Sequence, residues 1–470
     1  MREIFVRVAL SRRLILRLAA CATMFAAAGC AGFGEGVGRS VLSYVEGEGA
    51  PPDGFCRIEG WPFAGVAKAM ARSDGADGRK SVRMLIVHGI GPHDDNYSLR
   101  LSGMIAQQLG LDHRDPRQKR IHLANAPAQG SSPAPVIGRL LVTRFADAEE
   151  TRELIAFEVN WSDLNRDTRE AFVSADADID RVRASINASM KTFINRQMVD
   201  PIRYIGDQSP LVHDNVRLGA CWMISGSFAE YPDASARAPA TTSTFCPAIA
   251  DPARAAAVLA GDEFVAVTHS LGSRIFLDAF SAVGEYVDAD RADRIVNPFI
   301  GYATAFSDKQ ATVFMLSNQL TLLQLGLDSR TLRAADGAVI RLRNSERWPG
   351  AGAAAFCEAG GSMARERRFG RLAIVAVSDP NDLLSYRIPE DFADEYVDRR
   401  LCAQITNATI EIAPKRDLLG LSFADPMTAH NAYWSDPRIA ALIVEGFAPV
   451  APAHAAASGG NHCEREYFGR

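Results

Sequence analysis

The sequence predicts an α/β protein with a mostly parallel, doubly wound sheet and a helical insertion, and two observations lead to this fold class. Apolar runs of strand length are each followed by a segment with helical spacing, first at residues 82–88 and again at residues 263–268. Strands that alternate with helices form parallel sheets whose two faces are both covered, which makes their strands continuously apolar. Apolar residues make up 47% of the 470-residue chain and charged residues 23%, as in proteins that bury a core.

Charge and hydropathy exclude two classes of protein. The 51 basic and 56 acidic residues give a net charge of −5, whereas a nucleic-acid binder usually has a basic excess. The mean hydropathy is −0.05 and long apolar runs do not recur, which excludes a polytopic membrane protein. We therefore expect a large soluble domain that does not bind nucleic acid.

The N-terminus has the layout of an export signal. Residues 2–17 carry five Arg and one Glu, and residues 18–29 are small and apolar. A charged segment followed by a short apolar one is typical of a secretory signal peptide, which we expect over residues 1–29. Residues 11–17 (SRRLILR) also resemble a twin-arginine signal, so the export route stays open.

A lipidation site is expected at Cys30. With the preceding Ala-Ala-Gly, Cys30 resembles the lipobox of bacterial lipoproteins, although Ala27 stands where Leu is commonest. The resemblance implies an exported protein on the periplasmic side of the cell envelope, anchored to the membrane by lipid on Cys30. Ala31 is not Asp, which by resemblance to bacterial lipoprotein sorting indicates the outer rather than the inner membrane. An ordinary signal peptide cleaved near Ala28 or Ala31 is the alternative.

The cysteines fit an oxidising compartment. Without Cys21 and Cys30, six cysteines remain, an even number that predicts disulfides and leaves fifteen full pairings open. Cys221 and Cys246 bracket one loop-rich stretch, so we expect a bridge between them. No Cys-x-x-Cys occurs, so neither a zinc knuckle nor a redox pair of that type is indicated.

The order of the elements predicts the domain organisation. Residues 30–80 are rich in Gly and Pro and predict a tether with an irregular lead-in, and residues 448–470 predict a Pro/Ala/Gly-rich tail. Between them we expect one domain over residues 81–447 with a helical insertion at about 162–260. The expected strands are 82–88, 136–145, 154–161, 263–268, 312–316 and 372–377, and the expected helices are 96–109, 167–204 and 273–283.

Within the insertion, residues 167–204 have a helical pattern, whereas residues 211–250 have an irregular one. Apolar side chains at helical spacing are the candidates for a buried face of this long helix: Phe172, Val182, Ile186, Met190, Phe193 and Ile194.

Residues 268–272 (THSLG) have the pattern of a nucleophile elbow. They follow an apolar strand and precede a helix, so Ser270 is expected on a tight turn at the end of that strand. Such a turn needs small residues two before and two after the nucleophile; Gly272 fits, whereas Thr268 is bulkier than the usual Gly. A Ser that only caps the helix is the alternative.

Residues 88–91 (HGIG) directly follow the first apolar strand. Gly89 and Gly91 flank Ile90 and let backbone amides turn toward a common point. A plain glycine turn is one alternative. Another is a metal site, although its spacing matches no helical or hairpin ligand pattern, formed by His88, His93, Asp94 and Asp95.

An acid and a histidine follow later in the chain. Asp379 and Asp382 lie in a turn directly after the apolar strand 372–377, and two Leu residues follow Asp382. His430 lies near the end of the expected domain. The alternative is that both carboxylates only shape a Pro-Asn turn.

Together these segments resemble the α/β-hydrolase superfamily, with the closest likeness to its lipases and esterases. The order HGIG loop, Ser270, acid, His430 is the chain order of the family's oxyanion loop, nucleophile, acid and base, and the resemblance covers roughly residues 82–447. In the family the acid lies just beyond a late strand, often before apolar residues, which favours Asp382 over Asp379.

The resemblance implies a role for each of these residues. His430 would take the proton of Ser270, and Asp382 would orient the imidazole and stabilise its charge. The backbone N–H groups of Ile90 and Leu271 would form the oxyanion hole. The supporting residues of these two turns would be His88, Gly89, Gly91 and Gly272.

We therefore expect a serine hydrolase that cleaves carboxylic esters through an acyl-enzyme, with no cofactor and no metal. In the family an insertion of this kind often forms a cap or lid, and apolar residues in it favour a lipid or acyl ester: Met190, Phe193, Trp222, Met223 and Phe228. An acyltransferase or thioesterase on the same fold, or a non-catalytic envelope lipoprotein that acts as a binding module, is the alternative. The acyl and alcohol preference and the oligomeric state stay open.

Overall fold

The computed structural model describes residues 55–116, 118–124, 136–175, 178–206, 208–232, 251–281, 306–324, 331–333, 339–341, 351–389, 392, 396–418 and 421–448. The predicted signal peptide, Cys30, Cys246 and the tail beyond residue 448 lie outside these residues, so the predictions made for them stay predictions. Within the described ranges, every helix falls short of the length and hydrophobicity that a membrane span requires.

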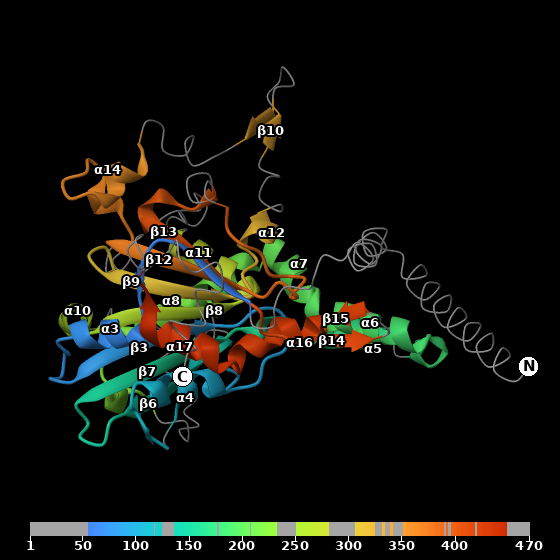
Figure 1. The fold of residues 1–470 in the computed structure, drawn as a ribbon, viewed down its shortest axis with the longest axis horizontal. Helices are drawn as coiled ribbons and strands as arrows, with labels where there is room; N and C mark the ends of the chain where they lie inside the picture. The colour runs from blue at the N-terminus through green and yellow to red at the C-terminus, as the bar shows by residue number, and fades with distance from the viewer. Residues whose placement is uncertain are drawn as a thin grey trace, which may run out of the picture. The chain divides into compact units, whose positions relative to one another are not determined.

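A mixed sheet of ten strands forms the centre of the described fold (Figure 1). Six neighbouring strands are parallel and lie in the order β13-β12-β9-β8-β3-β7. Their bounds are Lys80–Val87 for β3, Arg152–Asn160 for β7, Glu263–His269 for β8, Gln310–Leu316 for β9, Arg371–Ser378 for β12 and Ala403–Ile410 for β13. The predicted α/β class with a mostly parallel sheet is confirmed. β13 was missed because its buried and half-buried residues alternate, unlike the continuous apolar runs of the other five strands.

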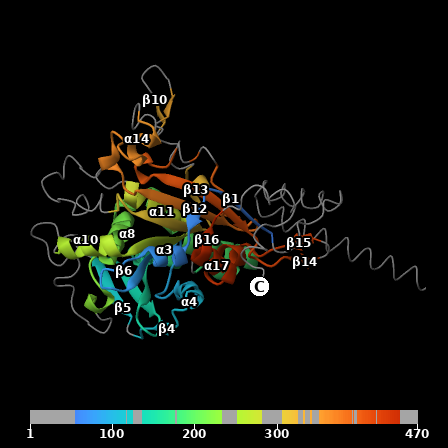
Figure 2. The same cartoon turned by 60° about the vertical axis from the view of Figure 1, so that its left-hand side comes forward.

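Antiparallel strands extend both ends of the parallel block (Figure 2). β1 (Cys56–Gly60) pairs with β13 at one end, and β6 (Val136–Ala146) pairs with β7 at the other. The short strands β4 (His113–Arg114) and β5 (Lys119–Ala124) both pair with β6. β1 and the helix α3 (Val66–Arg72) lie where the sequence predicts an irregular lead-in, so that prediction is wrong from Cys56 onward. Elements this short contain too few residues for their periodicity to be recognised.

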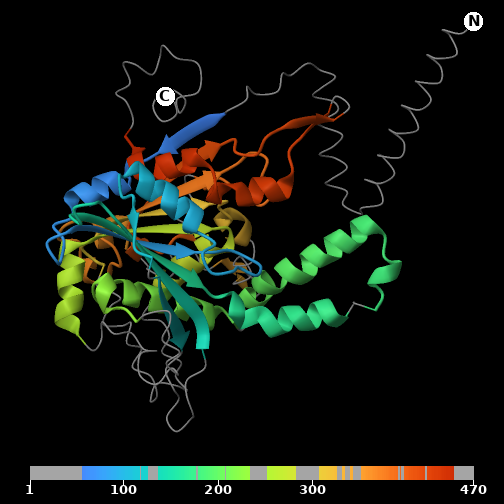
Figure 3. The ribbon, with the colours of Figure 1, turned by 90° about the horizontal axis from the view of Figure 1, so that it is seen from below.

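Helices cover both faces of the sheet (Figure 3). Side chains of a strand alternate between the faces, so on β3 Met84 and Ile86 join one core while Leu85 and Val87 join the other. The first core is covered by α3, α4 (Leu99–Gln108) and α17 (Pro437–Glu445), and the second by α8 (Ser209–Met223), α10 (Pro252–Gly261) and α11 (Leu271–Ser281). This two-sided coverage is the doubly wound arrangement that the alternating pattern predicts.

The insertion contains a series of short helices rather than the one long helix predicted. They are η1 (Ser162–Asn165), α5 (Arg166–Ala175), η2 (Asp180–Val182), α6 (Ser185–Gln197) and α7 (Val199–Ile205). α6 ends at Gln197 because, in a continuous helix, the ring of Pro201 would clash with the carbonyl group of Gln197. Figure 3 shows α5 and α6, in green, extending away from the sheet.

The predicted buried face of the insertion is wrong. Phe172 is 56% exposed, Val182 78% and Ile194 47%. These segments extend away from the sheet, so neither core is near enough to bury them. The side chains of Ile186, Met190 and Phe193 lie outside the described part of the chain.

The segment predicted to be irregular contains α8, a helix of fifteen residues that packs against the sheet. Its helical period was hidden because polar residues, among them Asn215 and Arg217, are buried along it. Trp222, Met223 and Phe228 belong to the same core. Their apolar character therefore stabilises the fold and gives no information about a substrate.

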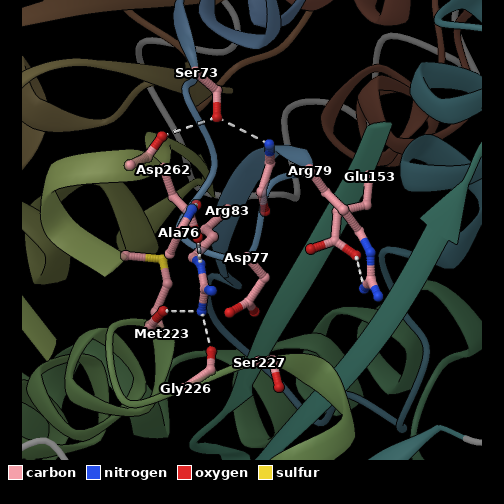
Figure 4. A network of polar contacts seen from close by, with 12 residues as sticks. Ser73, Ala76, Asp77, Arg79, Arg83, Glu153, Met223, Gly226, Ser227 and Asp262 are labelled. Carbon is pink, nitrogen blue, oxygen red and sulfur yellow. Dashed lines mark hydrogen bonds and ion pairs between the residues drawn. The ribbon is translucent and has the colours of Figure 1, made fainter. Parts of the chain in front are cut away.

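Buried Arg83 forms an ion pair with Asp262 and hydrogen bonds with the end of α8 (Figure 4). Arg83 on β3 is 1% exposed, and its Nε donates to Asp262 Oδ2 at 2.5 Å. Its Nη1 donates to the carbonyl oxygens of Met223 at 2.6 Å and Gly226 at 2.7 Å. Removing one partner of such a pair typically costs about 3–5 kcal/mol because the other charge stays buried. The network thus stabilises the return of the chain from the insertion to β8.

Disulfides are confirmed in the described part of the chain. Cys357, at the end of α14 (Ala353–Cys357), is bonded to Cys402, the residue before β13. Cys56 and Cys221 each take part in a disulfide as well. The predicted Cys221–Cys246 bridge stays a prediction because residue 246 is not described.

The remaining elements are short. They comprise β2 (Phe63–Ala64), which pairs with β16 (Gly446–Phe447), the hairpin of β10 (Thr331–Arg333) and β11 (Val339–Arg341), and the helices η3 (Phe228–Glu230), α12 (Leu320–Gln324), η6 (Ala364–Glu366), η7 (Arg399–Leu401), α16 (Pro426–Asn431) and η8 (Ala432–Trp434). A second hairpin, β14 (Arg416–Leu418) with β15 (Leu421–Phe423), belongs to a separate compact unit.

Candidate active site

The predicted site lies where the order of the parallel strands changes direction. β3 is flanked by β7 on one side and by β8 on the other, and β8 follows β7 in the chain. The connections that leave β3 and β8 therefore diverge, and in open α/β sheets ligands bind at the carboxyl ends of the strands at such a point. His88 directly follows β3, and Ser270 directly follows β8.

Ser270 forms a one-residue turn between β8 and α11. Its φ is 56°, a left-handed conformation that costs a non-glycine residue about 1–2 kcal/mol. The turn leaves no room for larger neighbours: a Cβ on Gly272 would lie 2.5 Å from the carbonyl oxygen of Val87, and one on Gly89 would lie 2.6 Å from Ser270 Cβ. Close approach thus requires glycine at two of the three positions that the sequence singled out, 89 and 272.

Thr268 stands where the elbow pattern has Gly, and its surroundings explain why it is tolerated. The side chain is fully buried, and its Oγ1 lies 3.0 Å from Ser273 Oγ in α11. The hydroxyl therefore has a hydrogen-bond partner, and it ties the strand to the first turn of the helix.

The hydroxyl of Ser270 has an unusual environment. Its Oγ is buried and has no hydrogen-bond partner among the described residues. A buried polar atom without a partner costs about 1–3 kcal/mol. The Ser270 hydroxyl therefore has a hydrogen-bonding capacity that the described residues do not use.

His88 holds the glycine turn that follows β3. The backbone N–H of Trp161 donates to His88 Nε2 at 3.2 Å, so Nδ1 carries the hydrogen and donates to the carbonyl oxygen of Gly89 at 2.8 Å. The ring stacks between Trp161, with ring centroids 4.9 Å apart, and His93, at 4.1 Å. Burial lowers the pKa of His88 well below 6.5, so the ring stays neutral. Through these contacts the His88 ring joins the glycine turn to Trp161, directly after β7.

The two amides predicted to form an oxyanion hole are both available. Neither the Ile90 N–H nor the Leu271 N–H donates a hydrogen bond to any described residue. Leu271 is the first residue of α11, where N–H groups lack partners within the helix and the helix dipole favours negative charge. Leu271 directly follows Ser270, and Gly89, which precedes Ile90, approaches Ser270 so closely that a Cβ on it would lie 2.6 Å from Ser270 Cβ.

His430 and Asp382 are brought together from distant parts of the chain. His430 Nδ1 lies 3.0 Å from Asp382 Oδ1 and 3.2 Å from Oδ2, and both residues are buried. The carboxylate also accepts from the Leu384 N–H at 3.0 Å and from the Tyr433 hydroxyl at 3.1 Å. Burial raises the pKa of Asp382, but the hydrogen bond and charge of His430 lower it more, so the net pKa lies below its usual value.

Asp379, the other candidate acid, has a different role. Its Oδ1 accepts from the backbone N–H of Asn381 at 2.7 Å, and its Oδ2 accepts from those of Ile412 at 2.9 Å and Ala413 at 2.7 Å. The carboxylate therefore shapes two loops. The geometry favours Asp382 as the partner of His430.

His269 links His430 to the turn at Ser270. Its Nε2 donates to the carbonyl oxygen of His430 at 2.7 Å, and His269 directly precedes Ser270. Burial lowers the pKa of His269 to about 3. The ring is therefore neutral near pH 7 and is too weak a base to replace His430. Its role is to hold the backbone of His430 beside the turn.

Ser317 is a site residue that the sequence reasoning missed. It follows β9 with a φ of 50°, donates from Oγ to Asp382 Oδ2 at 2.6 Å, and lies 2.9 Å from His430 Nδ1. The preceding residue, Leu316, accepts a hydrogen bond from the Ser270 N–H at 2.9 Å. The available signal was a polar residue directly after a buried strand, the same signal that identified Ser270.

Replacing Ser317 with Ala is expected to lower kcat about tenfold, since a hydrogen bond to a charged group is worth roughly 1.5–3 kcal/mol. The carboxylate would lose its shortest hydrogen bond, and the imidazole would lose the contact of Nδ1 with Ser317 Oγ. Steady-state kinetics on p-nitrophenyl esters would measure the change. Ser102→Ala is the matched control, because Ser102 is also buried and its Oγ has no partner in the described chain. Equal kcat values in the two variants would contradict a role for Ser317.

The alternative of a metal site in the HGIG segment finds no support. Asp95 pairs with Arg139, Nε to Oδ1 at 3.1 Å, and the rings of His88 and His93 stack face to face. In the part of the chain that the structure describes, no group of three or more His, Cys, Asp or Glu side chains is placed to hold a metal ion.

Comparison with known proteins finds no match. No family model matches the sequence, and no curated protein or solved structure is detectably similar to it.

Proposed function

We propose that the protein is a serine hydrolase of the α/β-hydrolase type that cleaves carboxylic esters through an acyl-enzyme intermediate. The observation that carries the proposal is the buried, unpartnered hydroxyl of Ser270, held in a left-handed turn next to an unpartnered amide. The hydrogen-bonded pair of His430 and Asp382 lies at the same edge of the sheet. This set supplies each group that acyl transfer to a serine needs.

In the proposed reaction, Ser270 Oγ attacks the ester carbonyl carbon while His430 Nε2 takes its proton. His430 Nδ1 donates to Asp382, which leaves Nε2 free of hydrogen in the neutral ring. The negative charge that develops on the carbonyl oxygen is stabilised by the N–H groups of Ile90 and Leu271. His430 then protonates the leaving alkoxide, and a water activated by His430 releases the acid from Ser270.

An ester with an apolar acyl chain is the proposed substrate class. The support is one exposed apolar side chain near the acid and one near the base: Leu383, next to Asp382, is 61% exposed, and Met427, one turn before His430 in α16, is 43% exposed. Exposed apolar side chains beside a reactive centre favour an apolar ligand.

Attachment to the cell envelope through lipid on Cys30 stays part of the proposal. Its support is the arrangement of charged and apolar residues before Cys30 and the presence of disulfides, which form in exported proteins.

The test combines covalent labelling with kinetics. A p-nitrophenyl phosphonate is expected to add one phosphonyl group to Ser270, found by mass spectrometry of the peptides, and to abolish hydrolysis of p-nitrophenyl esters of two to sixteen carbons. A rise in kcat/KM with chain length would support the acyl substrate. Added alcohols would reveal an acyltransferase by the formation of a new ester. A folded protein that neither reacts with the phosphonate nor hydrolyses any ester would contradict the proposal.

A further inference from the structure

The helical insertion reaches the loop that follows β3 through one buried carboxylate. Asp200, in the first turn of α7, is fully buried, and its Oδ2 accepts from the backbone N–H of Gly91 at 2.6 Å. Its Oδ1 accepts from Asn165 Nδ2 at 2.8 Å and from Arg169 Nη1 at 2.7 Å. A single side chain thus joins η1, α5 and α7 to the HGIG loop.

A second contact shows how closely the insertion lies on this loop. Gly91 has a φ of 92°, and a Cβ at this position would lie 2.0 Å from Gln197 Oε1, at the end of α6. The positive φ favours glycine here, and the absence of a Cβ leaves room for the end of the Gln197 side chain. The end of α6, at Gln197, and the start of α7, at Asp200, therefore both lie against this loop.

The contacts of the loop fix both peptide planes that flank Ile90. The Gly89 carbonyl, which shares a plane with the Ile90 N–H, is held by His88 Nδ1. The Gly91 N–H, which shares a plane with the Ile90 carbonyl, is held by Asp200. Because the peptide unit is planar, fixing both planes fixes the backbone dihedral angles of Ile90 and the direction of its N–H.

We propose that Asp200 is a positioning residue for the oxyanion hole, which keeps the Ile90 N–H aimed at the oxygen that becomes negative during acyl transfer. The inference rests on the proposed function. A charged acceptor makes a hydrogen bond roughly twice as strong as a neutral one, so the carboxylate restrains the loop more tightly than an amide or a water would. Donors that are already in place stabilise the transition state without the cost of rearrangement. The insertion thus contributes to the rate through Asp200, without contact with the reacting atoms.

Asp200→Ala is expected to lower kcat on the order of 10–100-fold, less than the loss of a whole oxyanion donor, because the Ile90 N–H remains but is no longer held. KM should change less than about threefold, since the interaction acts on the transition state. Asp200→Asn keeps the size of the side chain and an acceptor oxygen, so it should fold and show a smaller loss of the same kind. Asp214→Asn is the control: Asp214 is an acid of the same insertion, and it pairs with Arg217 in α8 rather than with the loop.

A readout specific to the oxyanion comes from paired substrates. Sulfur accepts hydrogen bonds weakly, so an ester whose carbonyl oxygen is replaced by sulfur gains little from the oxyanion hole. Wild-type protein should hydrolyse the oxygen ester faster than the sulfur ester. Both Asp200 variants should lower the ratio of these two rates and leave the pH profile of kcat/KM unchanged. A substitution that only destabilises the fold would lower both rates equally and leave the preference intact.

The outcomes separate the inference from the proposed function. Activity that is lost in Ser270→Ala but retained in both Asp200 variants, at the level of Asp214→Asn, would overturn the inference alone. An unchanged oxygen-to-sulfur preference would do the same. Activity that survives in Ser270→Ala would overturn the proposed function, and the role of Asp200 with it.

Discussion

Replacing Ser270 with Ala is expected to lower kcat for p-nitrophenyl ester hydrolysis by about 10⁴–10⁶-fold, to a level set by the oxyanion amides and substrate binding alone. Without the hydroxyl no acyl-enzyme can form, and His430 can only assist a direct attack by water. Stopped-flow and steady-state kinetics should show that the burst of p-nitrophenol, which reports acylation, is absent in the variant.

The same substitution should leave the protein at least as stable as before. The Ser270 hydroxyl is buried without a partner among the described residues, so its removal is expected to raise the free energy of unfolding by about 1 kcal/mol. Denaturant titration of the variant beside Ser102→Ala would measure this. Loss of activity together with a large loss of stability would show that Ser270 is a structural residue, as the helix-cap alternative requires.

Replacing Asp382 with Asn is expected to lower kcat about 10⁴-fold near pH 7. In the unsubstituted protein, His430 donates from Nδ1 to the carboxylate, which leaves Nε2 as the acceptor of the serine proton. The amide of Asn would donate toward Nδ1 and stabilise the opposite tautomer, in which Nε2 carries hydrogen and cannot act as a base. Kinetics over pH 6 to 9 would measure the loss.

Asp379→Asn provides the matched control, because it makes the same chemical change three residues away. Within the described chain, the two oxygens of Asp379 accept from three backbone N–H groups and from the side chain of Asn381. We expect a fall of about 1–3 kcal/mol in the free energy of unfolding, because the amide turns a donor toward those groups, and a nearly unchanged kcat per folded molecule. The reverse pattern, with kcat lost in Asp379→Asn and kept in Asp382→Asn, would show that the acid has been misassigned.

Local patterns predicted the parts of the fold and the site whose causes are local. A continuous apolar run of strand length is typical of a buried parallel strand, so β3, β8 and β12 could be recognised one at a time. The turn at Ser270 follows from small residues and the junction of a strand with a helix, all within five positions. Where burial depended on distant elements, the same reasoning was wrong. α6 has the spacing of a packed helix, but no core covers the side chain of Ile194.

By itself, the sequence determined the fold class, the elbow at Ser270, the glycine turn at Ile90 and the order of the candidate residues along the chain. Only the tertiary structure decided that Asp382 and not Asp379 meets His430, and that Ser317 and Asp200 belong to the site. The physical reason is distance along the chain. Asp382 is 65 positions from Ser317, and Asp200 is 109 positions from Gly91. Such hydrogen bonds depend on how the strands are ordered in the sheet and where the insertion folds back, and no local pattern of residues encodes either.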